Sequence, residues 1–333
     1  MSVQNGTNDI WIENASHLMD AVKTIIACLA VLGNGMVITV MLLRRRVFSS
    51  FTNRLILHQS MCVAGVVFLV WQVVLLNILT PMSLKGTIYD QLMCRLIYTD
   101  VPFWCLSVTS TYNLVMISLE RFMATCHPVK HRNCGSSAKL RFAMGTTWAI
   151  GFIYGSHFTF LLKAGREGCQ MTQMEIGLKI FATSVAMVIE YLVPITILIY
   201  AYSRITIKLA KKSANPMYRP RIDMNKAKKN VLVTTMLIGL MFAVCWTPTV
   251  VNHVRSLITG IKGDLSYAVA TSLVSCNTFV NPIIYCWKYE HFRLELRSLF
   301  IRRCRRNRVE DGNAIPMPAA VTRMNPNLAV QTL

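Results

Sequence analysis

The sequence has few charged residues and is especially poor in acidic ones. Only 15% of its 333 residues are charged, against about 25% in a typical soluble domain, while 53% are hydrophobic. The charges that are present do not balance, because 35 Lys and Arg face 15 Asp and Glu. A basic balance alone would fit a nucleic-acid-binding protein, but the scarcity of charge and the apolar content favour a membrane protein that binds no nucleic acid.

Charge is missing from seven long stretches of the chain. A membrane-spanning helix needs about 20 apolar residues, because the hydrocarbon core is about 30 Å thick. The stretches are Thr24–Leu43, Leu55–Leu84, Val101–Leu119, Phe142–Leu162, Ile180–Tyr202, Asn230–Val254 and Leu265–Trp287, and Glu190 is the one charged residue inside them. Backbone polar groups in lipid must be satisfied within the segment, so each stretch is predicted to be an α-helix. One stretch could be a buried helix of a soluble protein, but seven predict an all-α membrane protein with a seven-helix bundle.

The connecting segments predict the orientation of this bundle. Successive connecting segments lie on alternate sides of the membrane. The segments on one side (44–54, 121–141, 204–229 and 288–333) carry 27 Lys and Arg, and those on the other side carry 8. Because basic residues are retained in the cytoplasm, the N-terminus is predicted to lie outside the cell, in a multi-pass protein of the plasma membrane. The expected division of the chain is an outer tail at 1–22, the bundle at 23–287, an amphipathic helix at 288–301 and a disordered cytoplasmic tail at 302–333.

The outer tail carries two sites for modification. Asn5-Gly6-Thr7 and Asn14-Ala15-Ser16 are glycosylation sequons. The first eighteen residues are polar and have neither a basic start nor a small-residue cleavage site, so no cleavable signal peptide is expected and the first span is predicted to direct its own insertion.

The segment after the last span is predicted to lie along the inner membrane surface. In Lys288–Ile301 apolar residues such as Phe292 and Leu299 alternate with Arg293, Glu295 and other charged residues, as in an amphipathic helix that contacts lipid. Cys304 stands among four arginines beside this helix and is a candidate for palmitoylation. A cysteine without modification is the alternative.

Eleven cysteines are present, but only Cys94 and Cys169 fall in predicted outer segments. Disulfides persist in oxidising compartments, so a Cys94–Cys169 bridge is the favoured pairing. Two free thiols are the alternative.

Several spans contain polar residues and prolines, which are expensive in a bilayer and therefore mark function. Taken singly, each has an ordinary explanation such as helix bending or close packing. In chain order they are Asn34 in "GNGMV", Glu120, Arg121 and Phe122 in "LERF", Pro194 and Tyr202, Trp246 and Pro248 in "CWTP", and Asn281, Pro282 and Tyr285 in "NPIIY".

This ordered set resembles the motifs of the rhodopsin-like (class A) G-protein-coupled receptors, and the resemblance covers nearly the whole chain. It implies a receptor, not an enzyme, that binds an extracellular ligand and activates a heterotrimeric G protein without a cofactor or metal. It does not assign a subfamily.

The resemblance also implies roles for individual residues. Glu120 and Arg121 would pair at the inner end of the third span in the resting state, and Arg121 would be released to the G protein on activation. Trp246 would form the floor of the ligand pocket, while Pro248 and Pro282 weaken the sixth and seventh spans so that their inner halves move. Tyr202 and Tyr285 would meet across the opened inner face, and Asn281 would satisfy backbone groups that the Pro282 kink exposes.

Two features depart from the family pattern. The aspartate usual in the middle of the second span is replaced by Val63, so a sodium ion would find Ser110, Asn277 and Asn281 but no carboxylate, and sodium insensitivity is expected. The spacing from Cys94 to Arg121 is also two residues longer than usual, which predicts a bulge or an extra turn.

Candidate ligand-binding residues lie in the outer halves of the spans. They are Asp100, Phe103, Trp104, Glu190, Trp246, His253 and Arg255. Glu190 could meet a ligand cation, pair with His157 or His253, or be protonated. A short peptide is favoured as the ligand, and an amine or another small molecule remains open.

Other classes of protein fit less well. The chain has no internal repeat of the kind common in transporters, and no lysine in Leu265–Trp287 to hold retinal. No nucleophile–base pair or metal cluster indicates an enzyme. A receptor-like protein that does not couple to a G protein remains the open alternative.

Overall fold

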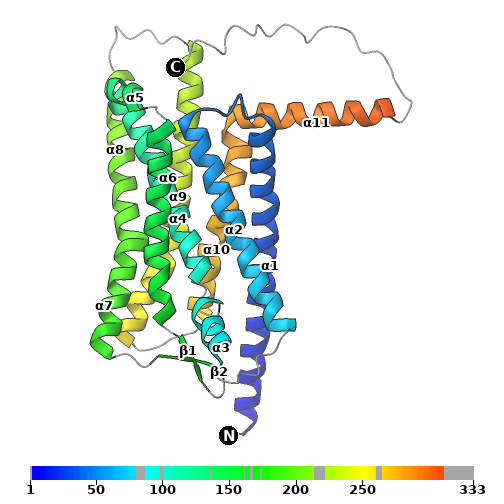
Figure 1. The fold of residues 1–333 in the computed structure, drawn as a ribbon, viewed down its shortest axis with the longest axis vertical. Coiled ribbons are helices and arrows are strands. Elements are labelled where there is room, and N and C mark those ends of the chain that lie inside the picture. Colours follow the sequence, from blue (N-terminus) through cyan, green and yellow to red (C-terminus); the bar gives the residue numbers. More distant parts are fainter. Residues whose placement is uncertain are drawn as a thin grey trace.

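The computed structural model describes residues 2–79, 87–97, 101–134, 137–160, 162–165, 168–172, 175–213, 222–259 and 265–310. Long helices run side by side to form a bundle, with α11 lying across one end and the N-terminus at the other (Figure 1). After the predicted orientation, the end at α11 is called the inner end and the opposite end the outer end. The helices that contain the predicted spans are α1 Ser2–Leu43, α2 Phe51–Leu79, α4 Val101–Cys126, α6 Ser137–Ser156, α7 Ile176–Met187 continued by α8 Val193–Ser213, α9 Ile222–Thr259 and α10 Leu265–Lys288. The predicted all-α bundle is confirmed.

The length and mean hydropathy of the described helices give a stricter criterion for a membrane-crossing segment than the absence of charge. By length and apolar content alone, three described segments could cross a membrane: Thr24–Leu43, Ile176–Lys211 and Leu232–Ser256. The other predicted spans lie in α2, α4, α6 and α10, and their assignment depends on their place in the bundle and on the family to which the chain belongs.

Shorter elements complete the described chain. They are α3 Ile88–Leu92, the π-helical segment Met93–Ile97, α5 Pro128–Cys134, a 3₁₀ turn at His157–Phe160, the π-helical segment Val188–Leu192, α11 Glu290–Glu310 and the strands β1 Leu162–Gly165 and β2 Gly168–Met171. The segment Met93–Ile97 just before α4 widens the chain locally, as the long spacing from Cys94 to Arg121 predicts.

The first helix begins earlier than the apolar stretch. α1 starts at Ser2 and runs without a break into the span predicted to start at Thr24. Residues 2–43 contain no proline, so no residue forces the helix to end where the apolar stretch begins. Polarity therefore locates the end of the apolar stretch but not the end of the helix; that the tail lies outside the cell stays a prediction.

The last helix also continues beyond its predicted end. α11 runs from Glu290 to Glu310, whereas the amphipathic helix was predicted to end at residue 301. Residues 302–310, predicted to be disordered, are helical because neither Gly nor Pro interrupts them. The rest of the predicted tail lies outside the described residues.

The outer segment between α6 and α7 forms the one β element in the described part of the chain, which the all-α prediction did not include. β1 and β2 pair antiparallel, with Leu162 opposite Met171 and Ala164 opposite Cys169. Cys169 in β2 is bonded to Cys94 in the π-helical segment at a Cα–Cα distance of 5.5 Å. The predicted disulfide is confirmed, and it ties this hairpin to the outer end of α4.

Two glycines one helical turn apart set the contact between α6 and α4. A Cβ atom on Gly151 would overlap Thr109 Oγ1 and the carbonyl oxygen of Cys105, and one on Gly155 would overlap Cys105 Sγ. Small residues at this spacing let two helix backbones approach closely, which is a main source of helix association in membranes. The close contact fixes the position of α4, the helix that carries Glu120 and Arg121.

The variant Gly151→Ala is expected to lower the thermal stability of the purified protein, because its Cβ would meet a backbone carbonyl that cannot turn away. Overpacking of this kind costs about 1–3 kcal/mol. Gly145→Ala on the same helix is the matched control, since a Cβ there has nothing within 4 Å. Equal melting temperatures for the two variants in detergent would contradict the packing described.

Candidate functional site

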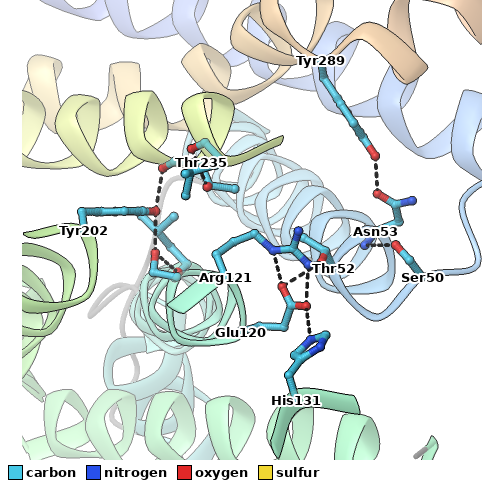
Figure 2. Close-up of polar contacts among 12 residues, drawn as sticks. Ser50, Thr52, Asn53, Glu120, Arg121, His131, Tyr202, Thr235 and Tyr289 are labelled. Carbon is cyan, nitrogen blue, oxygen red and sulfur yellow. Dashed lines mark hydrogen bonds and ion pairs between the residues drawn. The ribbon is translucent and has the colours of Figure 1, made fainter. Parts of the chain in front are cut away.

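Glu120 lies buried at the inner end of α4 and collects three partners (Figure 2). Arg121 Nε donates to Glu120 Oε2 at 2.5 Å, Thr52 Oγ1 donates to the same oxygen at 2.7 Å, and His131 Nε2 lies 2.9 Å from Oε1. Arg121 also donates through Nη2 to Glu120 Oε1 and to Thr52. A buried carboxylate needs such compensation, because leaving it unpaired in a low-dielectric region is costly. The structure thus brings the predicted pair together; that the pair marks a resting state stays a prediction.

Sequence reasoning missed two members of this cluster. Thr52 opens α2, and His131 belongs to α5, a short helix that begins with Pro128 at its first position. Both reach Glu120 only because α2 and α5 pack beside the inner end of α4. No local motif marks either residue, so the signal could come only from knowing which helices are neighbours.

Tyr202 connects α8, α4 and α9 on the other side of the same inner end (Figure 2). Its hydroxyl donates to the Thr235 carbonyl at 2.7 Å and lies 2.7 Å from Ser118 Oγ. The ring fits against Gly239, where a Cβ would approach Tyr202 Cε2 to 2.8 Å. Tyr285, the predicted partner of Tyr202, is fully buried in α10, and its hydroxyl has no hydrogen-bond partner among the described residues. The two tyrosines are therefore not bonded to each other here.

Pro282 leaves the carbonyl of Thr278 without its helical donor, because a proline has no N–H. Asn34 on α1 takes that place: its Nδ2 donates to the Thr278 carbonyl at 2.9 Å and to the Ala30 carbonyl at 2.9 Å. Gly33 permits the approach, since a Cβ there would lie 2.9 Å from Pro282 Cβ. The prediction gave this role to Asn281 and is wrong, because the donor comes from a neighbouring helix. Asn281 Oδ1 is itself buried without a partner in the described part of the chain.

A second buried polar network joins α2, α4 and α6 where the family aspartate is missing. Trp148 Nε1 donates to His58 Nε2 at 2.9 Å, so the ring proton sits on Nδ1, which faces Asn113 Oδ1 at 2.9 Å. Asn113 Nδ2 in turn donates to Gln59 Oε1 at 2.8 Å, and Gln59 Nε2 donates to Ser110 Oγ at 2.6 Å. Ser110, expected to face a cation, therefore accepts from a neutral amide, while Val63 is buried and apolar. This arrangement is consistent with the expected sodium insensitivity, which stays a prediction.

The outer candidate residues lie on several elements. Glu190 sits in the π-helical segment Val188–Leu192, one turn before Pro194. It faces the Tyr154 hydroxyl, and its Oε1 is buried without a hydrogen-bond partner among the described residues. Trp104 on α4 stacks on Phe158 with ring centroids 4.8 Å apart.

On α9, Trp246 is buried with its ring centroid 5.7 Å from that of Phe242. His253 Nδ1 faces the Thr249 carbonyl at 3.0 Å, and Arg255 Nη2 donates to Ser266 Oγ on α10 at 2.9 Å. The outer end of α9 is thereby connected to α10.

Some predicted sites cannot be placed. Asp100 lies outside the described residues, and so does the side chain of Phe103. Asn5 and Asn14 lie on α1 and Cys304 lies on α11, but only their backbone is described. The glycosylation and palmitoylation sites stay predictions.

A bundle of membrane-length helices with a buried Glu–Arg pair at one end and a disulfide-tied hairpin at the other defines a multi-pass membrane receptor. Residues 33–285 match the family described as "7 transmembrane receptor (rhodopsin family)". The chain belongs to this family, which is one of receptors, so the predicted resemblance is confirmed.

The curated relatives give the same picture at low identity. The chain is 24% identical over 308 residues to Galanin receptor 2b of Danio rerio, covering 89% of this chain and 78% of that receptor. It is 27% identical over 348 residues to Cholecystokinin receptor type A of Canis lupus familiaris, covering 83% and 79%. It is 24% identical over 298 residues to the Allatostatin-A receptor of Bombyx mori, covering 82% and 77%. The chain is therefore a G-protein-coupled receptor.

Replacing Asn34 by Leu is expected to destabilise the receptor, because the Thr278 carbonyl would be buried without a donor. Such a loss costs about 1–3 kcal/mol. Thr39→Ala is the control on the same helix, since the Thr39 hydroxyl bonds only to the local carbonyl of Gly35 and is exposed. Thermal unfolding in detergent compares the two, and an Asn34→Leu variant as stable as the control would show that Asn34 does not support the Pro282 region.

Proposed function

We propose that this receptor lies in the plasma membrane with its N-terminus outside, binds a short extracellular peptide and activates a heterotrimeric G protein. The observation that carries the proposal is that the Arg121 guanidinium is held by Glu120 and Thr52. In the proposed resting state this contact keeps Arg121 from the G protein. The choice of a peptide is supported by the relatives, whose names are those of galanin, allatostatin-A and cholecystokinin receptors.

Glu190 is the proposed recognition point for a basic group of the ligand. One part of its carboxylate is engaged by Tyr154, and Oε1 is buried without a partner in the described chain. A buried carboxylate is most stable when a cation and hydrogen bonds compensate its charge. The side chain of Lys or Arg, or a terminal amino group, would complete the pair. The Tyr154 ring contacts that of Phe158, with ring centroids 5.7 Å apart. The faces of such aromatic rings attract cations.

The conformational change that passes from the ligand to the G protein is proposed to occur where a proline interrupts the backbone hydrogen bonds of a helix. Pro248 lies inside α9 and removes one backbone hydrogen bond, which leaves a joint between the outer and inner halves. Trp246 and Phe242 lie just inside this joint, and Phe242 stacks on Tyr191, the residue after Glu190, at 6.3 Å. A ligand at Glu190 therefore acts close to the joint. It shifts the equilibrium only by as much as it binds the open form better than the closed form.

Membrane lipid is the proposed partner of α11. Phe292 is fully buried against the bundle, whereas Leu294, Phe300 and Ile301 are 53%, 61% and 67% exposed. Exposed apolar side chains on a helix lying across the end of the bundle (Figure 1) suit the boundary between headgroups and acyl chains.

A panel of short amidated peptides, with and without basic residues, tests the function in cells that carry reporters for several G-protein classes. A basic peptide is expected to activate the wild-type receptor. Glu190→Gln should weaken its potency at least about tenfold with an unchanged maximum, because one partner of a buried charge pair is worth more than 1.4 kcal/mol. Arg121→Ala should bind the same peptide but give no response.

Arg54→Ala is the control for Arg121→Ala, because Arg54 is an exposed arginine on the same inner side. A response that survives Arg121→Ala contradicts the proposed coupling. If no peptide activates the receptor but an amine does, the second candidate function, an amine receptor, is established. Glu190 would supply the same counter-charge for the amine. Binding without any G-protein response in the wild type would establish the non-coupling alternative.

A further inference from the structure

Among the side chains of α9 that the structure describes, which begin at Asn230, none is an acidic partner for Arg121. From Asn230 to Thr259 the sequence of α9 contains neither Asp nor Glu. The hydrogen bonds of the Arg121 guanidinium go to Glu120 on α4 and to Thr52 on α2. The hydrogen bonds of the pair at the end of α4 therefore close onto α2, and none of them holds α9.

α11 is fixed to the rest of the bundle by several contacts. Arg44 at the end of α1 pairs with Glu295 at 3.0 Å and donates to Ser298 Oγ at 3.2 Å. Phe292 is fully buried, with its ring centroid 6.4 Å from those of both Phe48 and Tyr285. These contacts reach α1, α10 and the segment after α1, so the first turns of α11 are a firm support.

The junction between α10 and α11 is fixed in the same way. The Tyr289 hydroxyl donates to Asn53 Oδ1 on α2 at 2.6 Å (Figure 2). Burial raises the pKa of Tyr289 to about 12, so the phenol keeps the proton that it donates. The next residue, Glu290, is the first of α11, where the helix dipole favours a negative charge.

Asn230 connects α9 to this support. Its Nδ2 donates to Glu290 Oε2 at 2.6 Å in a half-buried position. A hydrogen bond to a charged acceptor is stronger than one between neutral groups. Besides it, the inner half of α9 is bonded by Tyr202 to the carbonyl of Thr235, a contact that any residue at 235 would provide.

We propose that Asn230 and Glu290 form a latch, which holds the inner end of α9 against α11 in the resting receptor and opens when the receptor is activated. The proposal rests on the proposed function, in which the inner half of α9 moves about Pro248 to admit the G protein. It assigns the control of α9 to α11 rather than to Arg121. Glu290 and Asn230 are positioning residues: they set the equilibrium of α9 and need not touch the G protein.

The latch is tested on the full-length receptor in lipid nanodiscs, without ligand. The substitution Ala227→Phe, made with a fluorinated phenylalanine, reports the closed and open positions of the inner end of α9. Asn230→Ala should raise the open population about tenfold, as expected for the loss of a hydrogen bond to a charged group. Asn230→Asp should raise it further, because two carboxylates would then face each other.

Two further variants separate the latch from a general loosening. Glu295→Ala removes the contact of α11 with Arg44 but none with α9, so the fluorine spectrum should stay that of the wild type. The exchange Asn230→Glu with Glu290→Asn keeps the summed length of the two side chains and reverses donor and acceptor. It should return the open population to the wild-type level.

Basal nucleotide exchange on added G proteins is measured in parallel and should follow the open population. If the variants show the open spectrum but no added nucleotide exchange, the latch proposal stands and the proposed G-protein coupling is overturned. Unchanged spectra in Asn230→Ala and Asn230→Asp would overturn the latch, whatever the exchange rates. Equal effects of Glu295→Ala and Asn230→Ala, or a failure of the exchanged pair to close, would overturn it as well.

Discussion

A carboxylate buried at the inner end of a membrane helix is the constraint on which the rest of the site depends. Glu120 is costly to bury, and the structure compensates it with Arg121 from its own helix, Thr52 from α2 and His131 from α5. The same compensation occupies the Arg121 guanidinium. Three elements therefore meet at one charge, and any change that draws His131 or Thr52 away makes Arg121 easier to release.

The helices around this cluster satisfy their polar groups across the bundle. Asn34 supplies the donor that Pro282 lacks, Gly33 makes room for it, and Trp148, His58, Asn113 and Gln59 form a connected series that ends at Ser110. The hydrocarbon core of a bilayer contains no water to hydrogen-bond these polar groups, so contacts within the protein must satisfy them. These contacts join α1 to α10 and α2 to α4 and α6, and Pro248 interrupts the hydrogen bonds of α9. This arrangement suits a receptor in which one helix moves against the others.

Sequence reasoning predicted what depends on local pattern. The seven stretches, the Glu120–Arg121 pair and the Cys94–Cys169 bridge follow from hydropathy, from adjacency in the chain and from the scarcity of outer cysteines. It missed what depends on which helices are neighbours: His131 and Thr52 at Glu120, Asn34 in place of Asn281 at the Thr278 carbonyl, and Asn230 at Glu290. It also placed the start of α1 and the end of α11 by polarity, although polarity alone does not end a helix. The β1–β2 hairpin, whose strands are four residues each, was not predicted.

The most direct test of the central claim is the chemical reactivity of Arg121. The purified receptor without ligand is treated with phenylglyoxal, which modifies accessible guanidinium groups, and the extent at each arginine is read by mass spectrometry. In the wild type Arg121, whose side chain is 17% exposed, should react slowly. In Glu120→Gln, which keeps the shape but removes the charge, it should react several-fold faster, while exposed Arg54 reacts equally in both. Equal rates at Arg121 in the two proteins would show that Glu120 does not hold it and would contradict the account.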